Sequence, residues 1–574
     1  MLKKWAVCPP INPSFANQFP AWNPVVLQLL ANRDITEPGV IERFLKPNYA
    51  ADLHDPFLFV DMEKATDRIL RAIEKKESIV VYGDYDADGV SATAVMSSTI
   101  EALGGVVKAY IPFRETEGYG LNLKAVRELH GAGARLVVTV DCGTSNIKEA
   151  AALKAAGVDL IITDHHEEPL QLPDAFALIN PNTKRDRYPF RYLAGSGVAY
   201  KVATALLARH RQYPVTALPE GWEKWLLDLV AIGTIADLMP LLDENRTLVR
   251  YGLTVLQKTK RLGIQQLAAS ASTAVKDLNE RAVGFQIAPR LNAAGRLNHA
   301  STAYRLLITT DPAEAAKLAE ELNATNQERQ RLTEQITDQA TALIGEVREQ
   351  PILSAVGDDW PIGIVGLIAG RLTDRHYRPA LVISRRKGEI VGSGRSIEGF
   401  DITAGLRQCD QYLSRYGGHS QACGFTVKDE ASLQPFLDQM ASLAKSQLDV
   451  ATLVPVVSID AELKLEEITW ELLAELEKFI PFGSKNQKPK FLATDISVLD
   501  VQTVGADGKH LRLTVSHLTA EPRKLIGFYF GEWNARIKPG DRIDIVFEVD
   551  VNEWKGNREL QLKIVDLRMS EVND

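Results

Sequence analysis

Acidic residues and histidines follow three short segments, rich in Val and Ile, that the sequence predicts to be β-strands. These residues are Asp84, Asp86 and Asp88 after the first segment, Asp141 after the second, and Asp164, His165 and His166 after the third. The carboxyl ends of neighbouring parallel strands open onto one crevice of a sheet. We therefore expect these side chains to converge, together with Asp237, an acid in the apolar run Ile235–Leu238.

A cluster of carboxylates at neutral pH persists only if its members share protons or bind cations. Carboxylate oxygens suit both Mg²⁺ and Mn²⁺, and the histidine favours manganese. Two such ions, about 4 Å apart, would generate a hydroxide and clamp a phosphoryl group. The pattern therefore predicts phosphoester hydrolysis. The alternative for any single acid is a helix N-cap, and for His165-His166 an ordinary adjacent pair.

The elements that must position these groups alternate between strands and helices from about residue 78 to 193, which is typical of βαβ units in a parallel sheet. In the run Asp84–Asp88 we expect an extended backbone, which would send alternate carboxylates to one side. Gly89 would then allow a tight turn into a helix that begins at Val90.

The rest of the chain predicts an α/β protein with further domains. We assign residues 1–310 to an N-terminal extension and the catalytic domain, and residues 311–349 to a connecting helix with Asp311 as cap and Pro312 in its first turn. Residues 350–450 form a second, smaller α/β domain. Residues 451–574 are rich in strands and predict a barrel, with an OB-fold as the leading expectation.

Composition supports this interpretation and excludes several protein classes. The 574 residues, 45% hydrophobic and 24% charged, predict a multidomain globular protein. No apolar run is long enough to span a membrane, and prolines interrupt the first fifteen residues, so we expect a cytoplasmic protein. The four scattered cysteines favour neither a disulfide framework nor a thiolate zinc site.

The net charge of −8 argues against a protein coated in positive charge. From Pro481 to the C-terminus the charges balance, with 14 basic and 14 acidic residues. The acid excess therefore lies in the part of the chain that carries the motifs.

Four runs resemble, in order and context, the motifs of the DHH phosphoesterase superfamily: VVYGDYDADGVSATA, VDCGTSN, TDHHEEP and IGTIADLMPL. Further runs are similar to the RecJ family of bacteria within it, among them YIPFRETEGYGL, PRLNAAGRL, GIVGLIAGRL, GSGRS and GGHSQACGFT. This resemblance covers nearly the whole chain. It implies a DHH domain, a DHHA1-type domain and an OB-fold, and a 5′ to 3′ exonuclease that degrades single-stranded DNA to mononucleotides in recombination and repair.

The resemblance also implies roles for individual residues. Asp86, Asp88, Asp141, His165 and Asp237 match the family's metal ligands, and Asp84 is a further candidate. His166 would lie against the scissile phosphate or a second metal, with Asp164 supporting it. Pyrophosphatase-like relatives carry a histidine where this chain has Tyr82, which favours the RecJ branch.

Several residues are candidates for holding the substrate. The run Gly392–Ser396 offers backbone amides, the hydroxyl of Ser393 and the guanidinium of Arg395, which could cradle a phosphate. The alternative is a glycine-rich hairpin turn. His419 would help shape the same pocket. Further candidates are Arg114 and Arg296 for phosphates, and Tyr119, flanked by glycines, for stacking on a base; Arg296 could equally form a structural ion pair, and Tyr119 could close a turn.

The terminal barrel mixes basic and aromatic residues, as a single-strand groove does. Strand alternation should bury many of the aromatic ones. The basic residues are Lys485, Lys488, Lys490, Lys509, Arg512, Arg523 and Lys524, and the aromatic ones are Phe491, Phe528, Tyr529, Phe530, Trp533 and Trp554. The run PFGSKNQKPKF carries Lys485 and Gln487 where the family has Gly and Pro.

Two other functions compete with this interpretation. A relative acting on short oligonucleotides or a small phosphoanhydride would not require the length or the third domain. A non-catalytic scaffold should lack metal ligands, whereas every matching position is intact here. By resemblance we expect single-stranded DNA, single-strand binding protein and a recombination helicase as partners of a monomeric protein.

Overall fold

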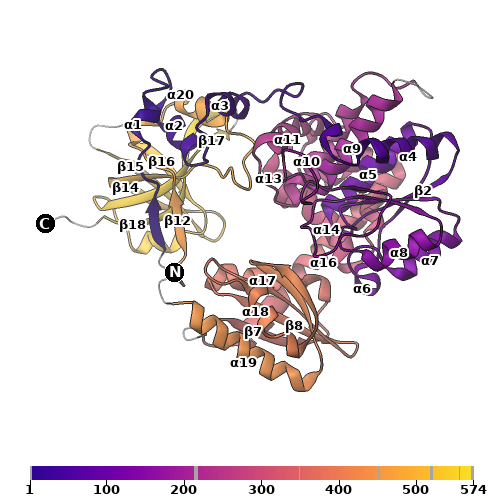
Figure 1. Ribbon diagram of the computed structural model, residues 1–574. Coiled ribbons are helices and arrows are strands. Elements are labelled where there is room, and N and C mark those ends of the chain that lie inside the picture. The colour runs from indigo at the N-terminus through magenta and orange to yellow at the C-terminus, as the bar shows by residue number, and fades with distance from the viewer. Residues whose placement is uncertain are drawn as a thin grey trace. The chain divides into compact units, whose positions relative to one another are not determined.

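The computed structural model describes residues 3–211, 217–347, 350–449, 452–517, 521–554 and 556–570, with only the backbone of Trp554. The chain forms two compact units (Figure 1). The catalytic unit consists of Tyr49–Met239 and Thr247–Val454. The barrel unit consists of Met1–Asn48, Pro240–Arg246 and Pro455–Asp574. The N-terminal residues thus group with the C-terminal strands, whereas the sequence placed them with the catalytic domain.

Five parallel strands form the first sheet of the catalytic unit, as predicted. Their order is β3 (Val106–Tyr110), β2 (Ser78–Tyr82), β4 (Leu136–Val140), β5 (Asp159–Thr163) and β6 (Ala177–Ile179). The central strands are almost fully buried because helices cover both faces. Helices α7 (Leu123–Gly131) and α8 (Ile147–Ala155) lie on one face, and α4 (Met62–Glu74), α5 (Ala87–Ala102) and α9 (Gly195–His210) lie on the other (Figure 1).

Helices dominate the segment that follows this sheet. They are α10 (Leu227–Ala236), α11 (Asp243–Leu256), α12 (Leu262–Ser270), α13 (Glu280–Ala282), the π-helical turn η4 (Val283–Ile287), α14 (Ala288–Leu297) and α15 (Ser301–Ile308). The predicted connecting helix is α16 (Pro312–Ile344), with the Asp311 side chain accepting a hydrogen bond from the amide of Ala313. It packs against α12, α14 and α15, and then against α17 and β7 of the next domain. One rigid element therefore contacts both α/β domains.

The second sheet of the catalytic unit has five strands in the order β10 (Leu413–His419), β11 (Ala422–Val427), β9 (Glu389–Arg395), β8 (Ala380–Arg386) and β7 (Leu353–Asp358). Only β7 and β8 are parallel. The domain's helices are α17 (Ile362–His376), α18 (Ile402–Gln408) and α19 (Glu430–Gln447). This is the smaller α/β domain that the sequence predicts after the connecting helix.

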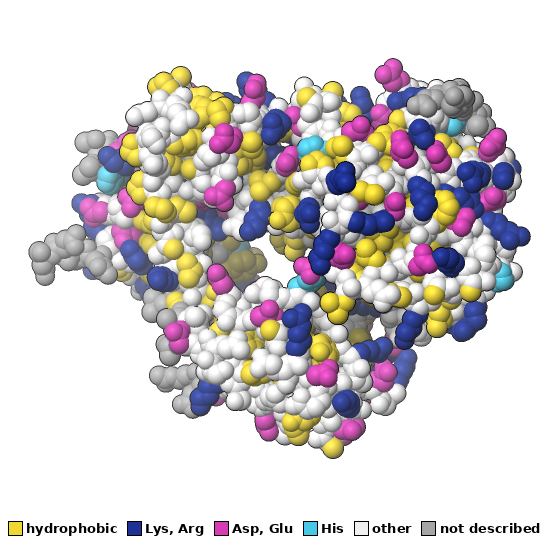
Figure 2. Space-filling view, in the orientation of Figure 1, with side chains coloured by type: hydrophobic (Ala, Val, Ile, Leu, Met, Phe, Trp, Pro, Cys, Tyr) yellow, Lys and Arg dark blue, Asp and Glu magenta, His cyan; other side chains and the backbone are white. Residues whose placement is uncertain are grey.

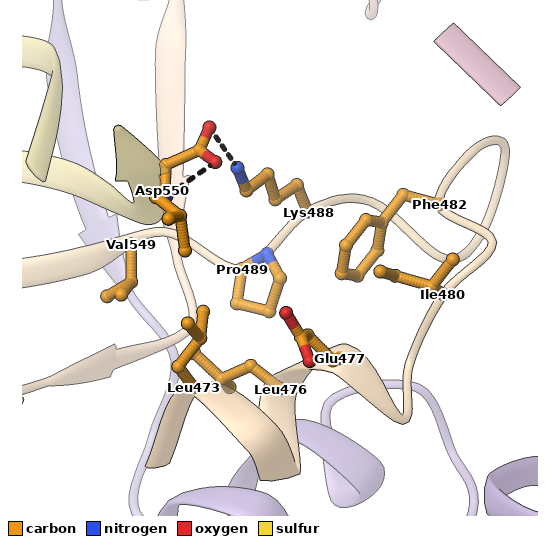
Figure 3. A pocket seen from close by; sticks show the side chains of 10 residues that line it. Leu473, Leu476, Glu477, Ile480, Phe482, Lys488, Pro489, Val549 and Asp550 are labelled. Atoms are coloured by element: carbon orange, nitrogen blue, oxygen red, sulfur yellow. Dashed lines mark hydrogen bonds and ion pairs between the residues drawn. The ribbon is translucent and has the colours of Figure 1, made fainter. Parts of the chain in front are cut away.

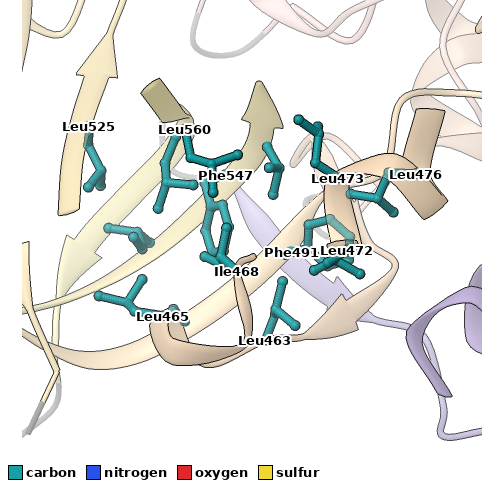
Figure 4. Close-up of a cluster of buried hydrophobic side chains, with 14 of the residues drawn as sticks. Leu463, Leu465, Ile468, Leu472, Leu473, Leu476, Phe491, Leu525, Phe547 and Leu560 are labelled. Atoms are coloured by element: carbon teal, nitrogen blue, oxygen red, sulfur yellow. The ribbon is translucent and has the colours of Figure 1, made fainter. Parts of the chain in front are cut away.

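The barrel unit contains a six-stranded sheet closed by an additional pairing of β14 with β17, which confirms the predicted barrel. Its strands are β13 (Ala461–Glu462), β14 (Phe491–Val504), β15 (His510–Ser516), β16 (Arg523–Gly527), β17 (Arg542–Trp554) and β18 (Asn557–Met569). Phe491 and Phe547 lie in its core beside side chains from α20 (Trp470–Glu477), as Figure 4 shows. No helix in the described parts of the chain is long and apolar enough to cross a membrane.

The N-terminal segment joins the barrel unit through both backbone and side chains. Strand β1 (Lys4–Val7) pairs in parallel with β12 (Val456–Ile459). Apolar residues of α2 (Pro24–Ala31) and α3 (Pro38–Leu45) belong to the barrel's core cluster. Arg246 is buried and donates hydrogen bonds to the carbonyl oxygens of Phe44 and Phe479, which ties the 240–246 segment to the same unit.

Candidate metal centre

The topology of the first sheet brings the predicted acidic groups together. Strands β2, β4 and β5 are neighbours and run in parallel, so the residues that follow them lie at one edge. Asp141 follows β4 directly, with a left-handed backbone (φ 62°), and Asp164 follows β5 directly. Asp237 reaches the same place as the C-cap of α10.

The run Asp84–Asp88 differs from the extended backbone expected from its alternation. Helix α5 begins at Ala87 rather than Val90, and Asp86 is its N-cap. The Asp86 carboxylate accepts hydrogen bonds from the amides of Asp88 and Gly89, both at 2.9 Å. A helical first turn therefore separates the carboxylates of Asp86 and Asp88. Asp86 therefore has both of the roles considered for it: it is the N-cap of a helix, and it belongs to the acidic cluster.

Seven of the eight predicted metal and catalytic residues form three overlapping groups whose ligand atoms lie within 4.8 Å of one another. The groups are Asp84, Asp86 and Asp141; Asp141, His165 and His166; and Asp88, His165 and Asp237. His165 links them, because its Nε2 lies 3.0 Å from Oδ1 of Asp141 and 3.7 Å from Oδ2 of Asp237. The cluster therefore offers carboxylate oxygens and imidazole nitrogen at metal-ligand spacing.

Asp164, the eighth residue, positions its neighbours. Its carboxylate accepts hydrogen bonds from the amides of His165 and Thr144, and its Oδ1 lies 2.8 Å from Nδ1 of His166. Burial alone would raise the pKa of Asp164, but the hydrogen bond and positive charge of His166 hold that pKa well below its ordinary value. The same contact raises the pKa of His166 to about 9 against the opposing effect of burial.

Four other carboxylates of the cluster lie in surroundings that do not stabilise their negative charge. Burial and the charge of neighbouring acids raise the pKa of Asp84 and Asp141 well above the ordinary range. They raise the pKa of Asp88 to about 6 and that of Asp237 to about 8. Among the residues the structure describes, Oδ1 of Asp84 has no hydrogen-bond partner, and Oδ1 of Asp141 has no contact that meets hydrogen-bond geometry, although Nε2 of His165 lies 3.0 Å away. Bound divalent cations would ionise these groups and satisfy the unpaired oxygens, so the donor set fits Mn²⁺ or Mg²⁺.

Two glycines that the sequence analysis did not select make room for the cluster. A Cβ at Gly195 would lie 2.5 Å from Cβ of Asp141, and one at Gly233 would lie 2.2 Å from Oδ1 of Asp88. The amide of Gly195 also donates to Asp88 at 2.6 Å. The signal was present in the runs AGSGVAY and AIGTIAD, where each glycine lies inside an otherwise ordinary helical pattern.

Tyr119 lies beside the cluster rather than free in solvent. Its hydroxyl donates to the backbone carbonyl of Asp141 at 3.2 Å and lies 3.0 Å from Nδ1 of His166. The ring is 46% exposed and contacts the His166 ring edge-on. Tyr119 therefore contacts both a candidate ligand and the candidate catalytic histidine, while part of its ring faces solvent.

Three of the predicted phosphate-binding residues converge at a second position in the catalytic unit. Burial lowers the pKa of Arg296 to about 10, with Arg114 and Arg395 contributing positive charge. Arg114 and Arg296 line a cavity of about 250 Å³, which residues of α17 and β9 help to complete. Arg296 donates to the carbonyl of Gly363 rather than to a carboxylate, so the structural ion pair is not seen in the described chain. The arginines' mutual repulsion would be relieved by an anion.

The run Gly392–Ser396 is not an open cradle of backbone amides. Residues Gly392, Ser393 and Gly394 lie within β9, which pairs with β8 on one side and β11 on the other. The expected phosphate-binding amides are thus in a central strand, and the hairpin-turn alternative is wrong as well. The glycines admit core side chains, since a Cβ at Gly392 would meet Phe425.

The side chains of Ser393 and Arg395 nevertheless lie on the face of the sheet that is turned toward the cavity lined by Arg114 and Arg296, here called the arginine cavity. Ser393 and Arg395 both approach Gly366 of α17, and Arg395 lies 3.3 Å from Oγ of Ser393. His419 is in register with Ala422, which is in register with Arg395. His419 therefore lies in the same row of the sheet, two strands from Arg395, and is exposed.

The barrel's basic residues are largely engaged in contacts within the barrel unit. Lys488 bonds to Asp550 at 2.9 Å beside an apolar pocket lined by Leu473 and Leu476 (Figure 3). Lys509 pairs with Asp507, and Lys524 with Glu559. Basic and acidic side chains are interspersed over the face in Figure 2, and neither sign forms a continuous coat.

Burial divides the barrel's aromatic residues as expected. Phe491 is fully buried, whereas Phe528 is 50% and Tyr529 79% exposed. The ring of His510 contacts both exposed rings. Phe530 and Trp533 pack partly against the core, and the side chain of Trp554 lies outside the described residues. His510, Phe528 and Tyr529 form the exposed aromatic cluster of the barrel.

Three family models match successive parts of the chain. The N-terminal domain of the DHH family matches residues 78–234, the DHHA1 domain matches residues 349–446, and the RecJ OB domain matches residues 459–566. These matches follow the order of the parallel sheet, the smaller α/β domain and the barrel.

Known proteins resemble the chain over most of its length. The single-stranded-DNA-specific exonuclease RecJ of Bacillus subtilis is 40% identical over 551 residues, which cover 96% of this chain and 68% of that protein. The protein of the same name from Haemophilus influenzae is 31% identical, with 97% of each chain covered.

Solved structures show the same architecture. A crystal structure of RecJ from Thermus thermophilus in complex with Mn²⁺ matches with a TM-score of 0.84 and 28% identity, covering 99% of this chain and 80% of that one. The complex of the same protein with Mg²⁺ matches with a TM-score of 0.78 and 27% identity, covering 99% and 79%.

Proposed function

The chain belongs to the RecJ family, and from this premise we propose that it is a metal-dependent exonuclease that hydrolyses single-stranded DNA in the 5′ to 3′ direction to mononucleotides. The observation that carries the proposal is the cluster of seven carboxylate and imidazole side chains, four of them buried, at the ends of β2, β4, β5 and α10. Its unpaired oxygens and raised aspartate pKa values are what a site for divalent cations requires. The relatives' names supply the substrate class.

The metal ligands in this proposal are the six residues Asp84, Asp86, Asp88, Asp141, His165 and Asp237. They would hold Mn²⁺ or Mg²⁺, and the overlap of their groups at Asp141 and His165 fits a pair of ions. When bound, such ions supply an activated water and offset the charge of the scissile phosphate. Burial and the charge of His166 lower the pKa of His165 to about 4, so its ring is neutral and able to act as a ligand at physiological pH.

His166 is the proposed catalytic residue beside the metal centre. With a pKa of about 9 it carries a proton at neutral pH. Asp164 accepts the hydrogen on Nδ1, which leaves Nε2–H to donate to a nonbridging oxygen of the scissile phosphate. Tyr119, hydrogen-bonded near both His166 and Asp141, limits the rotation of the imidazole. Asp164 and Tyr119 therefore act through the position of His166.

The arginine cavity would bind the terminal 5′ phosphate. Arg114, Arg296 and Arg395 bring positive charge to one place, and Ser393 adds a hydroxyl. His419, in the same row of the sheet as Arg395, would contact the strand at the edge of this pocket. Anchoring the terminal phosphate presents the next phosphodiester bond to the metal centre, which accounts for cleavage from the 5′ end. A path of this kind within the catalytic unit admits one strand, and duplex DNA is excluded by its width.

In this proposal, each of the segments assigned from the sequence has its own function. Residues 1–310 contain the metal centre, residues 311–349 hold the two α/β domains at a fixed spacing, residues 350–450 bind phosphate, and residues 451–574 guide the strand. Family membership supports a monomer acting in the cytoplasm in DNA recombination and repair, with single-strand binding protein and a recombination helicase as partners. A co-sedimentation assay with each purified partner would test those two contacts.

End-labelled single-stranded DNA, incubated with the protein and Mn²⁺, tests the proposal directly. We expect mononucleotide to be released first from the 5′ label, from the single strand and not from a blunt duplex. The variant Asp86→Asn should lose this activity, whereas the matched surface variant Asp174→Asn should keep it, because Asp174 forms an exposed ion pair with Lys154. Binding without cleavage by the wild type, with either divalent metal, would contradict the proposal and favour a scaffold.

A further inference from the structure

An exposed apolar residue directly follows the last candidate metal ligand. Leu238 succeeds Asp237 at the end of α10, has a left-handed backbone (φ 55°), and is 75% exposed. Glycine is the usual residue at this position of a helix end. Most of the apolar surface of this leucine is therefore exposed beside the last candidate metal ligand.

A second exposed apolar residue lies on the element packed against the end of α10. The π-helical turn η4 contacts α10, and the position of a Cβ at Gly284 lies 3.7 Å from Cγ2 of Ile235. Phe285, in this turn, is 77% exposed and makes no ring contact with any described residue. A π-helical turn adds a residue to a helix and is frequent at functional sites. Here it presents an aromatic ring to solvent.

The same helical run continues into the machinery described above. It proceeds from η4 into α14, where the Asn292 side chain accepts a hydrogen bond from the amide of Ala87 and where Arg296 lines the phosphate cavity. Phe285 is therefore held by a continuous element whose other end contacts the metal-binding loop. Leu238 follows Asp237 directly, and the turn that carries Phe285 packs against the helix that ends at Asp237.

Phe285 forms one wall of a surface hollow of about 410 Å³ with polar surroundings. Arg281, Asn279 and Thr273 also line it, with Asp277 as its acidic member. The guanidinium of Arg281 forms no ion pair within the described chain. An aromatic face next to an unpaired arginine and an amide side chain fits a base and its adjoining phosphate.

We propose that this hollow is a subsite for the single strand on the 3′ side of the scissile bond, where Phe285 stacks on a base and Arg281 binds a neighbouring phosphate. The inference deepens the proposed function and rests on it. Phe285 and Arg296 are eleven residues apart, roughly 16 Å along a helix. Stacked nucleotides rise about 3.4 Å each, so the base that Phe285 contacts lies within about the first five nucleotides.

Substrate length separates this subsite from the metal centre. With 5′-phosphorylated oligonucleotides, Phe285→Ala should raise the KM for a 12-mer at least about fivefold, the lower end of the stacking effect per base, and leave hydrolysis of a dinucleotide unchanged. Phe285→Trp should restore the 12-mer KM. Tyr192→Ala, which removes another exposed ring of the same unit, should change neither substrate. Arg281→Gln should weaken 12-mer binding and reduce its dependence on salt concentration.

Abasic 12-mers identify which nucleotide of the strand Phe285 contacts. In the wild type, one abasic site among positions two to five should raise KM as much as Phe285→Ala does, and the variant should be insensitive to that site alone. An unchanged 12-mer KM in Phe285→Ala, with the dinucleotide cleaved normally, would overturn the subsite and leave the proposed function standing. Failure of the wild type to cleave either substrate would overturn both.

Discussion

The metal centre and the exposed aromatic cluster of the barrel handle polar chemistry in opposite ways. At the metal centre, carboxylates from three separate segments and two histidines from a fourth lie within a few ångströms of one another. The pKa values of Asp84, Asp88, Asp141 and Asp237 are raised there. On the barrel, lysines such as Lys488 and Lys524 are neutralised by acids, while the rings of Phe528 and Tyr529 remain exposed. The metal centre thus concentrates uncompensated charge, whereas the barrel presents exposed apolar surface.

The two regions therefore differ in their effect on the stability of the fold. The buried acids destabilise the metal-free fold, and backbone amides such as that of Gly195 offset only part of this effect. The exposed rings forgo burial but create no unpaired charge. Substitutions at the two regions should therefore differ in magnitude and in their effect on stability.

The largest effect is expected at the metal centre. Asp141→Asn should reduce kcat at least about a thousandfold, because several kcal/mol of metal-assisted stabilisation are lost. In the presence of EDTA the same variant should be more stable than the wild type, since it removes a repelled, buried carboxylate. Single-turnover cleavage and thermal unfolding measure the two effects. If the variant is less stable than wild type without metal, the buried carboxylate of Asp141 does not destabilise the metal-free fold.

The arginine cavity should give the next largest effect. Arg395→Ala should raise the KM for a 5′-phosphorylated strand roughly ten- to a hundredfold, as expected for the loss of hydrogen bonds to a charged group. The KM for a 5′-hydroxyl strand should change little. Arg407→Ala, an exposed arginine on α18 of the same domain, is the matched control. Equal losses on both substrates would remove the terminal phosphate from this pocket.

The pH dependence of stability should distinguish the metal-free centre from the barrel. Asp237 has a pKa raised to about 8 and His166 one raised to about 9, so each stabilises the fold when protonated. That stability is complete below the unfolded pKa and is lost as pH rises through the folded pKa. With EDTA, Tm should fall on the order of 4 °C between pH 6.5 and 9.

Manganese should reduce this decline by removing the part due to Asp237, because ligation favours the deprotonated carboxylates. Asp237→Asn should make it shallower without metal and leave the part that His166 contributes. A Tm that is constant over this pH range in metal-free wild type would show that the raised pKa values do not contribute to stability.

The smallest effect is expected on the barrel. Tyr529→Ala should weaken binding of a long single strand about fivefold, the lower end of the range for one stacked base, and leave dinucleotide hydrolysis unchanged. Phe491→Ala, in contrast, should destabilise the barrel because Phe491 is fully buried. Fluorescence anisotropy with a labelled strand measures the first effect. A large loss of dinucleotide cleavage in Tyr529→Ala would assign the barrel a part in the reaction.

Local patterns in the sequence were sufficient for much of this architecture. Runs such as SIVVY and LVVTV predicted parallel strands, and Asp311-Pro312 predicted the start of α16. The acids at the strand ends could be placed together because the edge of a parallel sheet fixes their direction. The start of α5 was missed, since Asp86 can either continue a strand or cap a helix, and its hydrogen bonds decide between them.

The sequence did not predict which β-strands pair when they lie far apart in the chain. Nothing near Lys4–Val7 indicates that this strand pairs with Val456–Ile459, because the partner lies some 450 residues away in the chain. The run Gly392–Ser396 likewise looks like a loop until β8 and β11 pair on both sides of it.

The sequence by itself determined the chemistry of this protein: which acids, histidines and arginines are present, and which strand ends carry them. The tertiary structure decided which of these groups share one buried space, and therefore their charge. Asp164 and Asp141 are the same residue type at the ends of adjacent strands, yet the pKa of one is lowered and that of the other is raised. The difference arises because His166 bonds to Asp164, whereas Asp141 faces other carboxylates, and only folding sets those neighbours.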